Sequence, residues 1–229
     1  MENIIIAIDG YAATGKSTLA KRLANHLDYV YVDTGAMYRA VTLHALQNGW
    51  LDKSKSSQYT EFDQLDKFKI QFQLINKKQH TFLNGKDVES IIRRPEVSDN
   101  VSEVAAIPEV RDILVSQQRA MGIKKGIVMD GRDIGTVVFP NAECKFFLTA
   151  TPEVRAKRRL LELDLAGIKI SFNEVLENVK KRDKQDSSRA VAPLVKAADA
   201  LLIDVSELTI ENAFNTLLKV TNTHLVGNN

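Results

Sequence analysis

The segment that decides the fold is Ile4-Ile5-Ile6-Ala7-Ile8-Asp9-Gly10-Tyr11-Ala12-Ala13-Thr14-Gly15-Lys16-Ser17. Residues 4–8 are continuously apolar, which predicts a strand covered on both faces. Positions 10–17 fit the spacing Gly-x-x-x-x-Gly-Lys-Ser, and a helix-like run follows at 18–27. Glycines at these places let the backbone wrap an anion, while unpaired amides and the helix dipole supply positive potential. The segment therefore predicts a phosphate-binding loop between a buried strand and a helix.

A loop of this kind predicts binding of a nucleoside triphosphate. Lys16 is expected to reach the β- and γ-phosphates, and the Ser17 hydroxyl is expected to ligate Mg²⁺ that arrives with ATP. The residues expected to contact ATP are Gly10, Tyr11, Ala12, Ala13, Thr14, Gly15, Lys16, Ser17 and Thr18. The loop alone does not separate kinases, GTPases and mechanical ATPases.

Four more β-rich runs recur along the chain, at 29–32, 127–129, 145–148 and 201–203. Each is followed, directly or after a loop, by a helix-like segment, which predicts an α/β fold with a doubly wound, five-stranded parallel sheet. Four of the five runs end in an acid: Asp9, Asp33, Asp130 and Asp204. Ligands of open parallel sheets bind outside the carboxyl ends of the strands, so we expect these acids near the ligand.

One stretch interrupts the alternation of strands and helices. Residues 69–74 alternate in polarity, and residues 80–83 meet 86–88 across Asn84-Gly85, a strong hairpin signal. This pattern predicts a small antiparallel lobe, at about 64–89, inserted in the α/β core. Farther on, Pro152 and a capping box of Ser171 with Glu174 predict two consecutive helices.

The composition is that of an ordinary globular protein: 229 residues, 44% hydrophobic, 26% charged and a net charge of +2. These values exclude collagen-like, disordered and disulfide-scaffold classes. The dispersed charge offers no general field for nucleic acid or a membrane. The single Cys144 predicts a small buried side chain in a reducing compartment, and the apolar run 4–8 is too short for a membrane span. We expect a soluble, cytoplasmic protein.

Two segments place an arginine just after a predicted strand. They are Asp33-Thr34-Gly35-Ala36-Met37-Tyr38-Arg39 and Asp130-Gly131-Arg132-Asp133-Ile134-Gly135-Thr136-Val137-Val138. Arginine with polar neighbours suits a second phosphate, which it holds by charge-assisted and often bidentate contacts. A plain NTPase has no need of a second phosphate clamp, whereas a nucleotide kinase does.

With these motifs the sequence resembles the bacterial cytidylate kinases, which belong to the nucleoside monophosphate kinases among P-loop NTPases and transfer the γ-phosphoryl group of ATP to CMP and dCMP. The resemblance covers nearly the whole chain: the phosphate loop, 33–39, the inserted lobe, 102–111, 130–138 and 182–193. It implies a P-loop core of 1–38 and 102–229, with an NMP-binding region at 39–101. It also implies a monomer that acts with Mg²⁺ and ATP in pyrimidine nucleotide metabolism.

The resemblance implies a role for each acceptor-binding residue. The base is read by residues that match Ser102, Arg111 and Asp133. A carboxylate such as Asp133 can accept the amino group of cytosine, and uracil reverses that donor pattern. The residues that match those around the acceptor phosphate are Thr34, Tyr38, Arg39 and Arg132; those near the sugar are Arg182 and Asp186; Arg189 matches a residue near the phosphates.

The run Arg155-Ala156-Lys157-Arg158-Arg159 places four cations at the start of a predicted helix. Cations at a helix N-terminus oppose the helix dipole, and a bound polyphosphate would offset that cost, although a solvated face is the alternative reading. We expect a short helical lid at about 152–170. The residues expected to stabilise the transferred group are Lys16, Arg155, Arg159, Arg182 and Arg189. No general base is required, since the second pKa of a phosphate monoester is about 6.

Two departures from the family pattern concern Tyr11, where the family usually has proline, and Ser187 with Ser188, where it often has asparagine or arginine. Two other functions remain open from the residues themselves. One is a kinase for another small acceptor, such as UMP or a phosphorylated metabolite. The other is a P-loop regulatory or nucleic-acid-stimulated ATPase, which the two predicted phosphate clamps disfavour.

Overall fold

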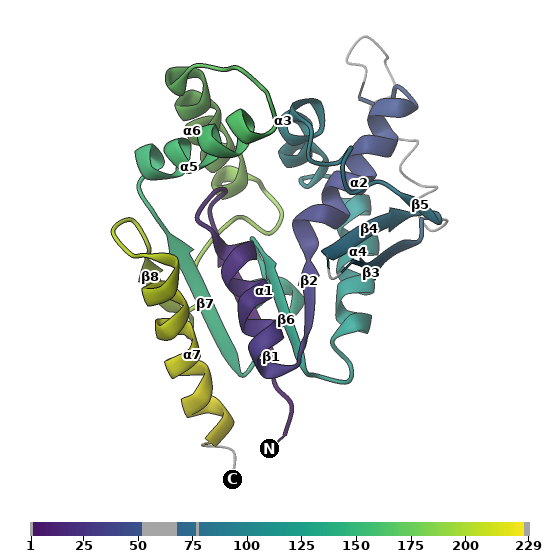
Figure 1. Ribbon diagram of the computed structural model, residues 1–229. Helices are drawn as coiled ribbons and strands as arrows, with labels where there is room; N and C mark the ends of the chain where they lie inside the picture. The colour runs from purple at the N-terminus through teal and green to yellow at the C-terminus, as the bar shows by residue number, and fades with distance from the viewer. Residues whose placement is uncertain (1, 52–67, 77, 227–229) are drawn as a thin grey trace. The chain divides into compact units, whose positions relative to one another are not determined.

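The computed structural model describes residues 2–51, 68–76 and 78–226 (Figure 1). The chain forms two compact units, residues 1–32 with 121–229, and residues 33–120. The second unit contains more residues than the NMP-binding region expected at 39–101. The helix that begins before residue 39 and the helices that extend beyond residue 101 also belong to it.

A five-stranded sheet forms the centre of the first unit. Its strands lie in the order β2 (Val30–Asp33), β6 (Ile127–Gly131), β1 (Ile5–Gly10), β7 (Cys144–Thr149) and β8 (Leu201–Asp204). β1 pairs in parallel with both β6 and β7, and β7 pairs in parallel with β8. The predicted α/β class and parallel sheet are confirmed, and β1 lies at the middle of the sheet with the phosphate loop at its carboxyl end.

Helices α1 (Lys16–Leu27) and α7 (Ile210–Val226) cover one face of this sheet (Figure 1). Ile8 of β1, Leu23 of α1, Phe146 of β7 and Leu217 of α7 are buried in one hydrophobic core. Burying side chains of this size stabilises the fold by about 1.5–3 kcal/mol each. The core therefore fixes the direction of α1, and with it the position of the loop that precedes α1.

Two helices follow β7, as the sequence predicts. α5 (Pro152–Leu165) begins after Thr151, whose hydroxyl accepts a hydrogen bond from the Val154 amide. α6 (Phe172–Ser188) begins with the predicted capping box of Ser171 and Glu174. They pack on each other through a small core of their own: Ala156, Leu163, Val175 and Val179. A five-residue π-helix, η2 (Ile134–Val138), follows β6.

The second unit combines three helices with a small antiparallel sheet. Its helices are α2 (Thr34–Gln47), α3 (Pro95–Val104) and α4 (Pro108–Met121), and its sheet has the order β3 (Ile70–Ile75), β4 (Lys78–Leu83), β5 (Lys86–Asp87). Asn84 and Gly85 have positive φ values of 49° and 79° at the turn between β4 and β5, as a tight hairpin turn requires. The predicted antiparallel lobe is confirmed at 68–76 and 78–89, while residues 64–67 and 77 lie outside the described part of the chain.

Cys144 is buried in the core of the first unit, with its sulfur 3.9 Å from the Thr221 hydroxyl. Burial raises the pKa of its thiol to about 12, so the thiolate is scarce at neutral pH. The expectation of a small buried side chain is confirmed. Among the described helices, none has the length and apolar character needed to cross a bilayer.

Gly10 joins β1 to the phosphate loop with a φ of 147°. A Cβ at this position would lie 2.1 Å from the carbonyl oxygen of Leu148 in the neighbouring strand. The close approach of the two backbones therefore excludes any side chain here.

We predict that Gly10→Ala lowers the free energy of unfolding by about 3 kcal/mol or more, through overpacking and backbone strain. Gly15→Ala is the matched control, because Gly15 also has a positive φ but a Cβ there meets no heavy atom within 4 Å. Urea unfolding of the two variants measures the difference, and equal losses would contradict the packing argument.

Candidate active site

The phosphate loop is curled by positive φ values at Ala13 and Gly15 and leads into the twelve-residue helix α1. The carbonyl oxygen of Tyr11 accepts hydrogen bonds from the Thr14 hydroxyl at 3.0 Å and the Lys16 ammonium group at 2.9 Å. Lys16 is only 6% exposed. Its positive charge is therefore held at the N-terminus of α1, where the helix dipole is also positive. The arrangement is suited to binding a polyphosphate.

The ring of Tyr11, at the position where the family usually has proline, has defined partners in the first unit. It packs edge-on against Phe147, with ring centroids 6.0 Å apart, and the guanidinium carbon of Arg155 lies 5.0 Å from its centroid. Aromatic and cation–π contacts of this kind each contribute about 0.5–1.5 kcal/mol. The contacts of the Tyr11 ring with Phe147 and Arg155 thus restrain the loop at this position, as the ring of a proline would do through the backbone.

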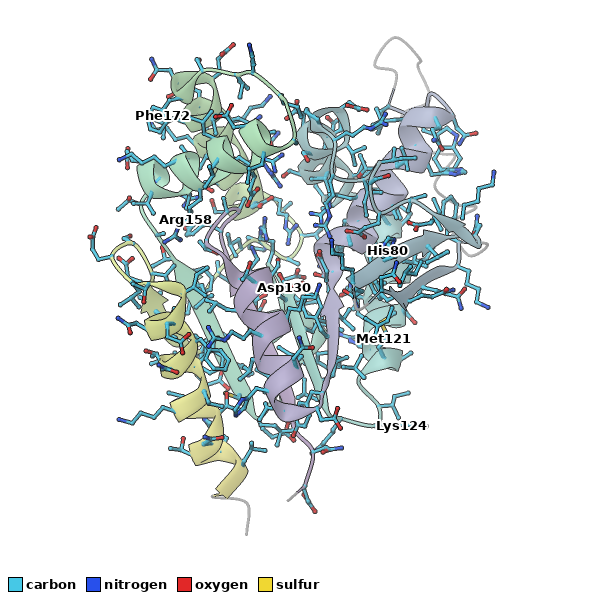
Figure 2. All side chains as sticks on the ribbon, viewed as in Figure 1. His80, Met121, Lys124, Asp130, Arg158 and Phe172 are labelled. Atoms are coloured by element: carbon cyan, nitrogen blue, oxygen red, sulfur yellow. The ribbon has the colours of Figure 1, made fainter. Side chains whose placement is uncertain are left out.

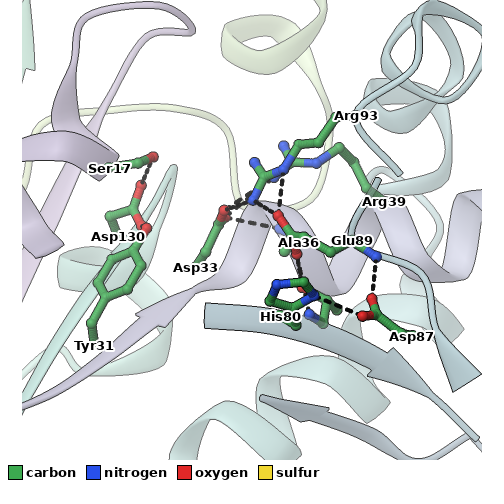
Figure 3. Close-up of polar contacts among 11 residues, drawn as sticks. Ser17, Tyr31, Asp33, Ala36, Arg39, His80, Asp87, Glu89, Arg93 and Asp130 are labelled. Carbon is green, nitrogen blue, oxygen red and sulfur yellow. Dashed lines mark hydrogen bonds and ion pairs between the residues drawn. The ribbon is translucent and has the colours of Figure 1, made fainter. Parts of the chain in front are cut away.

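Ser17, Asp130 and Tyr31 meet at the carboxyl end of the sheet (Figure 3). The Ser17 hydroxyl donates to Asp130 Oδ2 at 2.7 Å, and the Tyr31 hydroxyl donates to Asp130 Oδ1 at 2.9 Å. A hydroxyl beside a carboxylate fits Mg²⁺, which prefers few protein oxygens together with phosphates and water. The described residues contain no cluster of three or more His, Cys, Asp or Glu side chains able to hold a metal. The hydroxyl of Ser17 and the carboxylate of Asp130 are ligands of the kind that Mg²⁺ uses together with phosphate oxygens.

Asp9, at the end of β1, is a buried carboxylate that binds the turn after β6. Its two oxygens accept hydrogen bonds from the amides of Ile134 and Gly135, each at 2.8 Å. Burial raises the pKa of Asp9 to about 7, although the two amides and Lys16 favour the charged form. The carboxylate thereby holds the segment that carries Arg132 and Asp133 beside the central strand.

That segment is also tied to the end of α6 by two ion pairs. Arg132 Nε donates to Asp186 Oδ2 at 2.8 Å, and Arg189 Nη2 lies 3.5 Å from Asp133 Oδ1. All four side chains are largely buried. The structure therefore brings together four of the residues predicted to bind the acceptor, from two segments that lie more than 50 positions apart in the sequence. Arg182, a fifth predicted residue, lies on α6 one turn before Asp186.

Two of the cations on α5 bind the backbone of the phosphate loop. Arg155, 2% exposed, pairs with Asp183 and donates to the carbonyl of Ala12 at 3.4 Å. Arg158 donates to the carbonyls of Thr14 at 3.1 Å and Val205 at 2.8 Å (Figure 2). The sequence singles out neither Arg158 nor Asp183. For Arg158 the reason is that nothing in a run of adjacent arginines on a helix indicates which one faces a loop.

Arg159, expected together with Arg155 at the phosphates, has a different partner. Its guanidinium pairs with Glu162 at 3.0 Å on the same helix. In the structure the loop contact therefore belongs to Arg158, three residues after Arg155 and on the same side of the helix. The four cations divide between buried and solvated positions, as Lys157 is exposed.

In the second unit, Tyr38 and Arg111 are in contact. Arg111 Nη1 donates to the Tyr38 hydroxyl at 3.3 Å and to the Ala105 carbonyl at 3.4 Å. Arg111 is 3% exposed, so it is a buried arginine and not a solvated surface residue. Ser102 on α3 and Thr34 at the start of α2 are buried as well.

Asp33 is the acid at the end of β2, and it begins α2 by accepting a hydrogen bond from the Ala36 amide at 2.9 Å. Two arginines, Arg39 and Arg93, bind the same carboxylate oxygen at 3.1 Å and 3.0 Å. Burial would raise the pKa of Asp33, but the two guanidinium groups outweigh it and lower the pKa to about 2. Arg93 carries no sequence signal, because it lies in an irregular turn with no recognisable motif.

The central parallel sheet with the phosphate loop at its carboxyl edge defines a P-loop NTPase. Residues 6–223 match the protein family described as cytidylate kinase. The chain is 52% identical over 221 residues to the cytidylate kinase of Parabacteroides distasonis, covering 96% of each protein. It is 50% identical over 224 residues to that of Flavobacterium psychrophilum, covering 97% of this chain and 99% of the relative. The chain belongs to the cytidylate kinase family.

A solved structure of an uncharacterized protein from Eubacterium ventriosum shares the fold. The TM-score is 0.54 at 13% sequence identity, and the alignment covers 97% of this chain and 99% of that one. At this identity the likeness concerns the arrangement of strands and helices alone.

We predict that Asp9→Asn changes the pH dependence of stability. The folded-state pKa of about 7 is above the ordinary value of 3.8, so the contribution of Asp9 is fully present below pH 4 and is lost as the pH rises toward 7. Asparagine cannot ionise, so the melting temperature of the wild type minus that of this variant should decrease from pH 5 to pH 8. Thermal melts across this range measure the difference, with Asp164→Asn, an exposed acid on α5, as the control for loss of one charge. A difference that increases with pH contradicts the prediction.

We also predict that Arg158→Gln weakens ATP binding by about tenfold, since two charge-assisted hydrogen bonds to backbone carbonyls are lost and the loop is less well held. Lys157→Gln, which removes one exposed charge from the same helix, should change affinity less than twofold. Calorimetric titration with ATP distinguishes the two variants, and equal effects would assign the change to net charge alone.

Proposed function

We propose that this chain transfers the γ-phosphoryl group of ATP to CMP and dCMP, giving CDP and dCDP. The observation that carries the proposal is the ion-paired segment after β6, where Arg132 and Asp133 are fixed by Asp186 and Arg189 in a chain that belongs to the cytidylate kinase family. The segment offers a cation for a phosphate and a carboxylate for a base with an amino group.

On the donor side, Lys16 and the amides of residues 10–18 are proposed to bind the phosphates of ATP. Ser17 and Asp130, whose oxygen atoms are 2.7 Å apart, would hold the Mg²⁺ that comes with it. Magnesium in such a site neutralises charge that develops on the transferred phosphoryl group. Tyr31, by donating to the second oxygen of Asp130, fixes the orientation of that carboxylate.

On the acceptor side, the base-reading residues are proposed to be Asp133, Arg111 and Ser102. Arg111 and Asp133 are both buried, so a base that fails to pair with them leaves polar groups unsatisfied, and discrimination follows. The other proposed contacts are Thr34, Tyr38, Arg39 and Arg132 for the phosphate, Arg182 and Asp186 for the sugar, and Arg189 near the phosphates.

Catalysis is proposed to rest on positioning and charge, because the acceptor phosphate is already a nucleophile near neutral pH. Lys16, Arg159, Arg182 and Arg189 are proposed to stabilise the transferred group. Arg155 is proposed to act with them, and its bond to Ala12 and its pair with Asp183 hold its guanidinium against the loop backbone.

The experiment that tests the function is ADP formation from Mg·ATP with CMP, dCMP, UMP, AMP, GMP or no acceptor, measured in parallel. We expect strong turnover with CMP and dCMP alone. Strong turnover with another acceptor would favour a different small-molecule kinase, and turnover without any acceptor would favour an ATPase.

Asp133→Asn, assayed on the same panel, should reduce the preference for CMP over UMP at least tenfold, since an amide can donate to the uracil oxygen as well as accept. A variant that keeps full discrimination would show that another residue reads the base.

A further inference from the structure

The turn between β5 and α3 carries a polar chain that links the antiparallel sheet to Asp33 within the second unit. Glu89 Oε2 accepts hydrogen bonds from the amide and hydroxyl of Thr81 on β4, at 3.1 Å and 2.7 Å. Its other oxygen accepts from Arg93 Nε and Nη2, at 2.9 Å and 2.8 Å. Arg93 Nη2 also donates to Asp33 Oδ2 at 3.0 Å (Figure 3).

Arg39 depends on the same carboxylate. Its Nη2 lies 3.1 Å from Asp33 Oδ2 and 3.4 Å from Oδ1. The guanidinium reaches Asp33 by folding over Gly35, where a Cβ would lie 3.0 Å from Arg39 Nη1 and 3.1 Å from Asp33 Oδ1. Two positive side chains therefore share one carboxylate oxygen, and the absence of a side chain at Gly35 leaves room for Arg39 to reach it.

Sharing alters what Arg39 can offer to an anion. A carboxylate bound by one arginine alone forms a neutral, closed pair, and an incoming phosphate has to displace it. When a second arginine also binds that carboxylate, Arg39 holds a smaller share of its negative charge, while the charge of Arg93 is balanced mainly by Glu89. The low pKa of Asp33, about 2, has the same cause, since Arg39 and Arg93 outweigh its burial.

We propose that Arg93 is a positioning residue for acceptor binding: held by Glu89, which is anchored on Thr81 of β4, it shares the Asp33 carboxylate with Arg39 and leaves Arg39 available to the acceptor phosphate. The inference rests on the proposed function through the role of Arg39 in holding that phosphate. It makes phosphate affinity depend on the antiparallel sheet, since Glu89 transmits the position of β4 to Arg93.

Arg94 provides a matched control. It is the next residue, it is also an arginine, and its side chain is 60% exposed with Glu96 as its ion-pair partner at 4.0 Å. Replacing either arginine with glutamine removes the same charge from adjacent positions. Only Arg93 is bound to Asp33 and Glu89, so a difference between the two variants reports on the shared carboxylate.

The test is calorimetric titration of the wild type, Arg93→Gln, Arg93→Lys, Glu89→Gln and Arg94→Gln with CMP and with cytidine, which lacks the phosphate. Arg93→Gln should weaken CMP binding about tenfold and leave cytidine binding unchanged. Arg93→Lys keeps the charge without the planar fork and should recover part of the loss. Glu89→Gln should weaken CMP binding by a smaller factor, and Arg94→Gln should change it less than twofold. Melting temperatures measured alongside show that each variant is folded.

Several outcomes would overturn the inference. Equal CMP affinities for Arg93→Gln and Arg94→Gln would remove any special role for Arg93. An equal loss of cytidine affinity would show general damage to the acceptor site, and an Arg93→Lys variant as weak as Arg93→Gln would exclude charge sharing. If the wild type itself binds no CMP, the proposed function fails. If the wild type binds CMP and Arg93→Gln binds it equally well, only the inference about Arg93 fails.

Discussion

The buried carboxylate of Asp9 connects the two segments on which the first unit's chemistry depends. It stands at the end of the central strand, immediately before the phosphate loop, and it accepts the amides of Ile134 and Gly135 after β6. Buried backbone amides without partners are costly, and so is a buried carboxylate without donors. The Asp9 carboxylate and the two amides therefore stabilise one another. This one side chain holds the phosphate loop and the segment with Arg132 and Asp133 in a fixed relation.

A second constraint is the repulsion among buried cations of the first unit. Arg132, Arg155 and Arg189 are all largely buried, and each lies against an acid: Asp186, Asp183 and Asp133 respectively. An isolated buried charge costs several kcal/mol, so these acids make a concentration of arginine compatible with a stable fold. The same pairing holds each guanidinium in one orientation, which lowers the entropy that a ligand must remove on binding.

Much of this arrangement could be predicted from the sequence. The continuous apolar run before Gly10, the loop spacing up to Ser17 and the hairpin at Asn84-Gly85 are local signals, and the structure confirms the elements they predict. The sequence also shows which strands end in an acid, and one of these acids, Asp130, accepts a hydrogen bond from Ser17 of the phosphate loop. The partners of these residues could not be predicted, because nothing along the chain marks Tyr31, Asp183 or Arg93 as a partner of Asp130, Arg155 or Asp33, which are distant in the sequence.

The sequence by itself determined the fold class, the phosphate loop and most of the residues proposed to bind substrates, since spacing along the chain fixes which groups follow each strand and open each helix. Only the tertiary structure decided which of two neighbouring arginines on α5 reaches the loop, and that Arg111 is buried against Tyr38. It also decided that Asp33 is shared by two arginines. The physical reason is that charge pairing and burial depend on distances between elements that the order of residues does not specify.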